Sequence, residues 1–269
     1  MYYKIINIQL NIHIQPDVLG EEWKKFRDKQ EMDDHTAEIK IQVQQDYENV
    51  YYSIESYNLE ANKEVNVFRL NSDVMLWNRG EMKFTILPLN DRESLRAFVI
   101  QVFYTHAVQR HMIQFHSSLI DFDGHGLMFL GPSGIGKTTQ AELWHTYRDA
   151  VIINGDIVFV QETEGNFLGW GTPWHGSSPY CENASVPVDA LIILKQAPKN
   201  QIRKLEGFEK VSAVSGSIFY PRWLENGMEL CLETLNHLLC ALPVYELSCR
   251  PDEAAVELAE KTVFGGERF

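Results

Sequence analysis

Alternation of apolar and polar residues dominates the first 90 positions and predicts strands. Apolar side chains recur at every second position over 8–14 and over 39–43, which is the spacing of a strand with one buried face. Shorter apolar segments, separated by turns that contain Asn and Gly, continue the pattern at 65–67, 75–77 and 84–87. A charged stretch over 21–34 is compatible with a short helix or a loop. We therefore expect residues 1–90 to form a β-rich N-terminal module.

A helical period replaces the alternation after position 90. Asn90 or Asp91 can cap a helix, and Glu93 strengthens its start. Apolar residues then follow at helical spacing, which predicts one amphipathic helix over 92–113. Two apolar runs separated by Asp-Gly come next and predict a β-hairpin with strands at 118–122 and 125–130.

Apolar runs and helical patterns alternate through the remainder of the chain. Strands are predicted at 150–160 with an interruption at 154–156, and at 167–170, 188–194 and 244–247. Helices are predicted at 138–147, 230–242 and 252–261. This alternation is typical of an α/β fold, so we expect residues 91–269 to form an α/β core behind the β-rich module.

The segment 131–139 reads Gly-Pro-Ser-Gly-Ile-Gly-Lys-Thr-Thr and completes the nucleotide-binding pattern G-x-x-x-x-G-K-S/T. Its glycines let backbone N–H groups turn inward around phosphate oxygens, and the following helix directs its positive N-terminus at them. Lys137 can reach the β- and γ-phosphates, and the Thr138 hydroxyl can hold Mg²⁺. We expect ATP to be bound by Gly131, Ser133, Gly134, Ile135, Gly136, Lys137, Thr138 and Thr139.

An acidic residue near the loop is needed as the second ligand of Mg²⁺. Asp156 closely follows an apolar run and lies one helix downstream of Lys137, so we favour it as this ligand. The alternative is a structural role, because Asn-Gly-Asp is also ordinary turn chemistry.

Composition excludes several classes of partner. The net charge of −13 argues against a nucleic-acid surface and against attraction to anionic lipid. Polar residues interrupt the apolar positions at the N-terminus, so we expect no signal peptide, and no apolar run is long enough to span a membrane. The four cysteines include no C-x-x-C pair, so we expect reduced thiols in a cytoplasmic protein.

The loop and its surroundings resemble the catalytic domain of HPr kinase/phosphorylase. The similarity rests on His116, on Gly124-x-Gly126, on the phosphate loop and on a strand that ends in an acidic turn. It covers about residues 115–195 well and extends more loosely to about 260. That family shares its fold with ATP-dependent phosphoenolpyruvate carboxykinase and phosphorylates a serine of a carrier protein. Related stand-alone kinases modify a serine in lasso-type precursor peptides.

Two departures from this family bear on the chemistry. HPr kinases carry Asp-Asp at the acidic turn, the first as the base for the seryl hydroxyl, whereas this chain has Gly155 before Asp156. The family's Glu-Ile-Arg-Gly stretch is replaced by a loop over 169–178 that is rich in Gly and Trp. His175 in this loop is one candidate for moving a proton, and His116, which the resemblance places in the site, is the other.

We therefore expect a P-loop kinase core of the HPr kinase/carboxykinase type behind the β-rich module. The expected reaction is transfer of the γ-phosphoryl group of ATP to a hydroxyl of a peptide, a protein or a small molecule, with serine favoured. The missing acid at Gly155 motivates the alternative of a non-catalytic nucleotide sensor. A phosphorylase or phosphatase is a third and weaker alternative.

Overall fold

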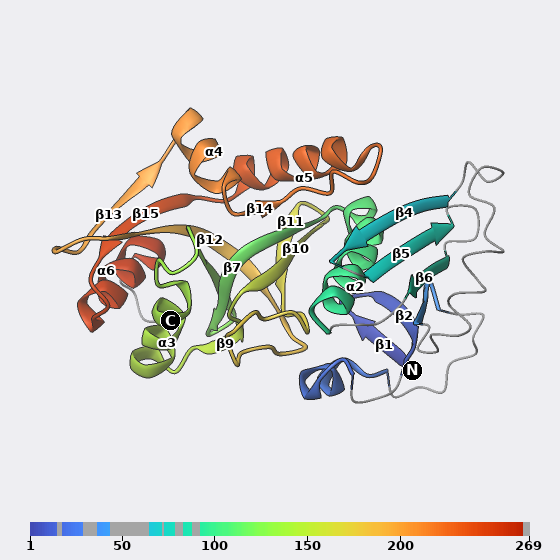
Figure 1. Cartoon of the computed structure of the whole chain (residues 1–269). Coiled ribbons are helices and arrows are strands. Elements are labelled where there is room, and N and C mark those ends of the chain that lie inside the picture. The colour runs from blue at the N-terminus through green and yellow to red at the C-terminus, as the bar shows by residue number, and fades with distance from the viewer. Residues whose placement is uncertain are drawn as a thin grey trace. The chain divides into compact units, whose positions relative to one another are not determined.

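The computed structural model describes residues 1–14, 18–28, 37–43, 65–71, 73–78, 83–87 and 92–265 (Figure 1). These residues form two compact units, which divide between His106 and Ala107. The chain is a mixed α/β protein built on a sheet in each unit.

The N-terminal unit is built on a sheet with the strand order β1-β2-β3-β6-β5-β4. Its strands are β1 (Tyr2–Ile5), β2 (Ile8–His13), β3 (Ile39–Val43), β4 (Val65–Leu70), β5 (Asp73–Asn78) and β6 (Lys83–Leu87). The alternating positions Ile8, Leu10 and Ile12 are all fully buried, as predicted, but Asn11 between them is buried as well and the strand ends at His13. The charged stretch begins with the short 3₁₀ helix η1 (Glu21–Phe26), and its later part lies outside the described residues.

Helix α2 (Arg92–Ala107) packs with this sheet, where the rings of Phe84 and His106 lie 6.3 Å apart. Its predicted cap residues Asn90 and Asp91 lie outside the described residues. The two units divide after His106, so α2 belongs to the N-terminal unit. The boundary predicted from the sequence, between residues 90 and 91, would instead place α2 in the C-terminal core.

The prediction of a helix up to residue 113 is wrong at its C-terminal end. A 3₁₀ turn η2 (Val108–Arg110) follows α2, and His111 then adopts a left-handed conformation with φ 54°. Met112 already begins the long strand β7 (Met112–Phe122). The error arose because the first four residues of this strand, the polar Gln114 included, are all buried, so its start shows no alternation of apolar and polar residues.

The C-terminal unit is built on a second sheet with the order β11-β10-β7-β8-β12-β15-β13. β9 and β14 also pair with β7, and β11 pairs with β12, so β7, β8, β12, β11 and β10 close into a circuit. The strands are β8 (His125–Leu130), β9 (Val151–Asn154), β10 (Ile157–Thr163), β11 (Asn166–Trp170), β12 (Ser185–Gln196), β13 (Gln201–Leu205), β14 (Ile218–Phe219) and β15 (Val244–Cys249). The helices are α3 (Lys137–Arg148), α4 (Gly207–Ser215), α5 (Gly227–Ala241) and α6 (Glu253–Phe264).

The predicted hairpin between β7 and β8 is confirmed. Phe122 pairs with His125, and both residues of the two-residue turn, Asp123 and Gly124, have positive φ. That backbone is the one that favours Asp-Gly in a tight hairpin. The hairpin positions the predicted phosphate loop, because β8 leads directly into it.

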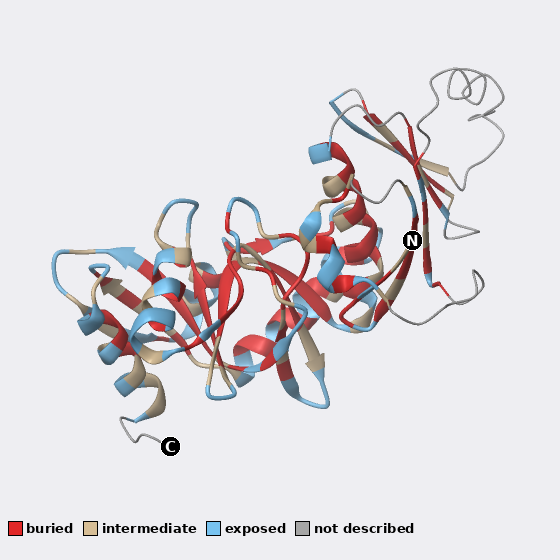
Figure 2. Ribbon diagram, turned by 90° about the horizontal axis from the view of Figure 1, so that it is seen from below, coloured by how far each residue is buried: buried red, intermediate tan, exposed pale blue. Residues whose placement is uncertain are grey.

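Strands β8, β12 and β15 run parallel at the centre of this sheet. Figure 1 shows α3 and α6 below the strands and α4 and α5 above them. Phe129, Trp144, Ala190 and Val256 are fully buried in the core between these strands and the helices α3 and α6. Figure 2 shows that buried residues are concentrated in the strands and exposed residues in the loops and on the outer faces of helices. Loops at the carboxyl ends of parallel strands are the usual place for a ligand site.

Three elements of this unit escaped the sequence patterns, namely β13, α4 and β14. β13 is an edge strand with mostly exposed side chains, so it shows no apolar alternation. Within the described part of the chain, no helix combines the length and apolar character that crossing a bilayer needs.

Candidate functional site

The phosphate loop joins the end of β8 to the start of α3. Gly131, Gly134 and Gly136 have φ values of 141°, 77° and 111°, which is backbone that other residues rarely adopt. Ser133, Gly134 and Thr139 are exposed, so this loop presents its surface to solvent. Ile135 differs from the others, because its amide donates to the Pro132 carbonyl at 3.3 Å and its side chain packs against the core.

Lys137 is buried and its ammonium stays within the loop. Its Nζ donates to the carbonyl oxygens of Gly131 and Pro132, each at 3.2 Å. Burial lowers the pKa of Lys137, and the nearby charge of Asp156 opposes that shift. The ammonium and this carboxylate therefore share one electrostatic environment.

Two hydroxyl groups connect α3 to its neighbours. Ser118 on β7 donates to the Lys137 carbonyl at 2.9 Å, which fixes the first turn of the helix to the sheet. Thr138 Oγ1 donates to the Gly155 carbonyl at 3.2 Å. Because the Thr138 proton is used in this bond, the lone pairs of its oxygen remain available to a cation.

Asn154 holds the acidic turn in place. It is fully buried, and its Oδ1 accepts hydrogen bonds from the backbone amides of Asp156 and Ile157 at 2.9 and 3.0 Å. Its Nδ2 donates to the carbonyls of Thr172 and Trp174 at 3.0 and 3.1 Å. A single side chain thus joins the turn after β9 to the loop after β11.

Asp156 and His116 form a pair beside the phosphate loop. Asp156 Oδ1 lies 3.1 Å from His116 Nε2, and both side chains are partly exposed. The backbone supports this placement, because Ser117 N donates to the Asp156 carbonyl at 2.9 Å and His116 N donates to the Ser217 carbonyl at 2.8 Å. The ring of Phe219 lies 6.3 Å from the His116 ring.

Ser178 occupies the space beside Gly155. A Cβ built on Gly155 would lie 2.5 Å from the Ser178 Cβ and closer still to its Oγ. The backbone of Gly155 is not left-handed, so the glycine is required by the neighbouring side chain rather than by backbone strain. A side chain at this position cannot be accommodated while Ser178 keeps its place.

The loop over 171–178 covers the acidic turn, and its residues 171–174 are buried. The Nδ1 atom of His175 pairs with the Ser178 carbonyl, and the amide of Ser178 donates back to the His175 carbonyl at 3.1 Å. Gly176 has φ 58°, and a Cβ there would lie 2.8 Å from the Asp156 Cγ. A side chain at position 176 would therefore collide with the Asp156 carboxylate.

The structure thus brings Lys137, Thr138, Asp156 and His116 together, and it gives His175 a contact within its own turn. Sequence reasoning missed Asn154 and Ser178. Asn154 is part of the Asn-Gly-Asp triplet that the sequence offered, but two of its four hydrogen bonds go to the loop after β11, which lies far away in sequence. Ser178 gave no signal, because its role depends on meeting Gly155 in space.

No cluster of three or more His, Cys, Asp or Glu side chains suited to a metal ion occurs among the described residues. A protein cage of that kind is not needed for Mg²⁺, which keeps most of its waters and uses one or two protein oxygens together with substrate phosphates. Asp156 and Thr138 supply oxygen atoms of this kind beside the phosphate loop.

Comparison with known proteins identifies a family. The model of the family described as "SynChlorMet cassette protein ScmC" matches residues 90–249, which is more than half of the chain. The chain belongs to this family. No curated protein matches the chain.

One of the solved structures that match is that of the HPr(Ser) kinase/phosphatase from Coxiella burnetii. It shares 11% sequence identity, and the match covers 56% of this chain and 97% of that one with a TM-score of 0.34. At this TM-score the match does not by itself establish a common fold. The resemblance of the motifs to HPr kinase therefore stays a prediction.

Proposed function

We propose that this protein is a Mg²⁺-dependent kinase that transfers the γ-phosphoryl group of ATP to a hydroxyl group. A serine of a peptide or protein is the favoured acceptor, as the resemblance to HPr kinase implies. The observation that carries the proposal is the His116–Asp156 pair, which lies beside a complete phosphate loop. Besides phosphate binding, phosphoryl transfer needs a metal ligand and a group that orients the acceptor, and Asp156 and His116 would supply these two.

Phosphate binding falls to the loop and to the start of α3. The backbone amides around Gly134 and Gly136 form the nest, and the N-terminus of α3 adds its partial positive charge. The Lys137 ammonium, which donates to two loop carbonyls, would turn to the β- and γ-phosphate oxygens. These contacts align the phosphate chain for attack and stabilise charge in the transition state.

Thr138 and Asp156 would hold Mg²⁺. The Thr138 oxygen has its lone pairs available, and the Asp156 side chain is 29% exposed, with no side chain from position 176 placed against it. When bound, the ion would neutralise charge on the phosphates. Because Oδ1 of the same carboxylate faces His116, Asp156 would serve the metal and the histidine at once.

His116 is the group that we assign to the acceptor proton. The acceptor oxygen forms a bond to the γ-phosphorus while the bond from phosphorus to the bridging oxygen of ADP breaks. The neutral imidazole takes the hydroxyl proton at the nitrogen that does not face Asp156, and the carboxylate stabilises the imidazolium. His175 is the weaker candidate, because its ring already pairs with the Ser178 carbonyl.

A nucleotide-binding sensor is the second candidate, and a specific observation favours it. The position that holds the base in HPr kinases is Gly155 here, and Ser178 fills the space in front of it. If His116 does not replace that base, the site binds ATP without transferring phosphate.

The test is ADP release from Mg²⁺-ATP with a panel of serine peptides and small hydroxylated acceptors. A kinase should show acceptor-dependent release that falls by roughly 10²-fold or more in His116→Ala, the usual effect of losing a general base. The matched control is His237→Ala, because His237 pairs with Glu162 at 3.0 Å on the surface of the same unit. Tight ATP binding without ADP release from any acceptor would establish the sensor, and unchanged release in His116→Ala would remove His116 from the mechanism.

A further inference from the structure

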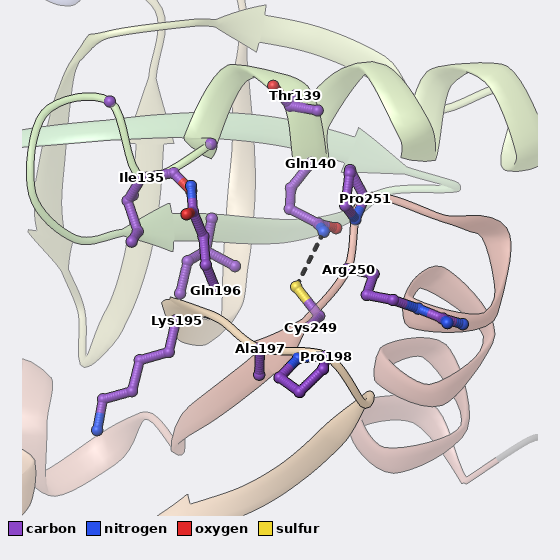
Figure 3. Close-up of a pocket in the computed structure, with 13 residues that line it drawn as sticks. Ile135, Thr139, Gln140, Lys195, Gln196, Ala197, Pro198, Cys249, Arg250 and Pro251 are labelled. Carbon is purple, nitrogen blue, oxygen red and sulfur yellow. Dashed lines mark hydrogen bonds between the residues drawn. The ribbon is translucent and has the colours of Figure 1, made fainter.

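A cavity lies next to the phosphate loop, at the carboxyl ends of the parallel strands β8, β12 and β15. Its volume is about 630 Å³, and its walls come from the loop, from α3 and from the segments that follow β12 and β15 (Figure 3). The proposed chemistry uses only the wall formed by the loop, and it gives no role to the walls formed by the ends of β12 and β15. Its position is that in which open α/β sheets bind ligands.

The cavity and the acidic turn lie on different sides of the loop. β8 has β7 as one neighbour in the sheet and β12 as the other. Asp156 is bonded to β7 through the Ser117 amide, whereas the cavity is lined by Leu194 and the residues that follow it on β12. A triphosphate in the loop with its γ-phosphate at Asp156 therefore extends its other end toward the cavity.

We propose that this cavity binds the nucleoside part of the substrate, with adenosine as the favoured class. The proposal rests on the kinase or sensor function proposed above, because both place a nucleoside triphosphate in the loop. Phosphoryl transfer would then occur on the β7 side of the loop, and the nucleoside would be recognised on the β12 side.

The lining suits a flat apolar base with a polar edge. Ile135, Ala197 and Pro198 give apolar surface at the loop side and at the far wall. Gln140 reaches from α3 toward Cys249, and its Nε2 donates to the Cys249 Sγ at 3.2 Å (Figure 3). Pockets for organic ligands combine such walls with a few polar groups that fix orientation.

Gln140 is the polar group that points to a ligand. It is 3% exposed, and its Oε1 has no hydrogen-bond partner within the described part of the chain. A buried acceptor without a partner is unfavourable, so a ligand that supplies a donor gains binding energy here. A rotation of the terminal amide would present both a donor and an acceptor, the combination with which Gln recognises adenine.

Two charged residues lie at the rim, and both are paired with acidic neighbours. Arg250 forms an ion pair with Asp252 at 2.8 Å. Lys195 forms an ion pair with Glu246 at 2.5 Å, and its side chain extends away from Cys249 in Figure 3. The cavity is therefore not a second phosphate site, and its recognition depends on the Gln140 amide and on shape.

Calorimetry with inorganic triphosphate and with ATP, each with Mg²⁺, tests this assignment. Wild-type protein should bind ATP at least about tenfold more tightly than triphosphate and should prefer ATP over GTP. Ala197→Phe places a ring in the cavity and should reduce ATP affinity to that of triphosphate, with triphosphate affinity unchanged. Ala213→Phe is the control, because Ala213 is partly buried like Ala197 but lies on α4, and it should behave as wild type.

Each outcome decides between the proposals. If Ala197→Phe binds ATP as wild type does, or if wild type shows no preference for ATP over triphosphate, the nucleoside does not use this cavity. If wild type binds neither ligand, the proposed function itself fails. Preference for GTP would overturn the assignment to adenosine while leaving the cavity as a nucleoside site.

A second measurement needs no variant and covers the case in which Ala197→Phe does not fold. Alkylation of Cys249 should slow at least about fivefold with saturating Mg²⁺-ATP, whereas the exposed Cys240 should react at an unchanged rate. The reaction is run at alkaline pH, because burial raises the pKa of the Cys249 thiol. Equal labelling of Cys249 with and without ATP, in protein that binds ATP by calorimetry, would overturn the proposal.

Discussion

Replacing Gly155 with alanine tests the closest contact in the candidate site. The added Cβ would lie 2.5 Å from the Ser178 Cβ, whereas non-bonded carbons rest about 3.5–4.0 Å apart. Ser178 must therefore move by about 1 Å or more, and overpacking of this kind costs about 1–3 kcal/mol. The same contact implies that Gly155→Asp cannot simply restore the carboxylate that HPr kinases carry at this position.

A double-mutant cycle isolates this contact from other effects. Ser178→Gly removes both atoms that collide, and it also removes the acceptor of the Tyr180 amide at 3.2 Å. Losing that bond costs about 0.5–1.5 kcal/mol, and the added glycine costs roughly 0.5–1 kcal/mol in chain entropy. The double variant should therefore be about 1–3 kcal/mol more stable than the sum of the two single changes predicts.

Urea unfolding followed by circular dichroism measures the four free energies of unfolding. A parallel melting series should show Gly155→Ala lower by about 2–4 °C for each kcal/mol lost. If Gly155→Ala is as stable as wild type, or if the two changes are additive within about 0.5 kcal/mol, Ser178 does not explain the glycine.

Two further predictions concern the charged and polar groups of the turn and the loop. Burial lowers the pKa of Lys137, so the affinity for inorganic triphosphate should fall with rising pH at a lower pH than an ordinary lysine pKa of 10.5 implies. As pH rises from the lowered pKa of Lys137 in the folded state to its value in the unfolded state, the free energy of unfolding should rise, because the unfolded state binds more protons in this range. Calorimetry measures the triphosphate affinity across this range, and urea titrations measure the free energy of unfolding. Lys137→Ala should abolish both pH dependences. Asn154→Ala should lower the free energy of unfolding by roughly 2–4 kcal/mol, because it removes four hydrogen bonds of a fully buried side chain. Its control is Asp156→Asn, which keeps those four hydrogen bonds. This variant should have a free energy of unfolding within about 0.5 kcal/mol of wild type, but it should lose the Mg²⁺-dependent part of the stabilisation by ATP. Strong destabilisation of Asp156→Asn would instead show that Asp156 has a structural role in the turn.

Local patterns were sufficient for the elements whose neighbours are close in sequence. The strand β8, the loop and α3 could be predicted because one continuous segment carries both the apolar run and the motif. The end of α2 could not, because Met112 and the residues after it are buried on both faces and so lose the period of a strand. The circuit closed by β11 and β12 depends on pairing between strands whose sequences show no sign of their partner.

The acidic turn shows where this limit lies within the site. The sequence offers Asn154-Gly155-Asp156 either as a structural turn or as a metal ligand, as though one role excluded the other. In the structure the roles fall on different residues: Asn154 caps the turn, Gly155 gives Ser178 its space, and Asp156 presents its carboxylate to His116. The turn chemistry thus positions the carboxylate rather than competing with it. Asp156 is held in place by contacts from distant parts of the chain, so its role could not be decided from the sequence around it.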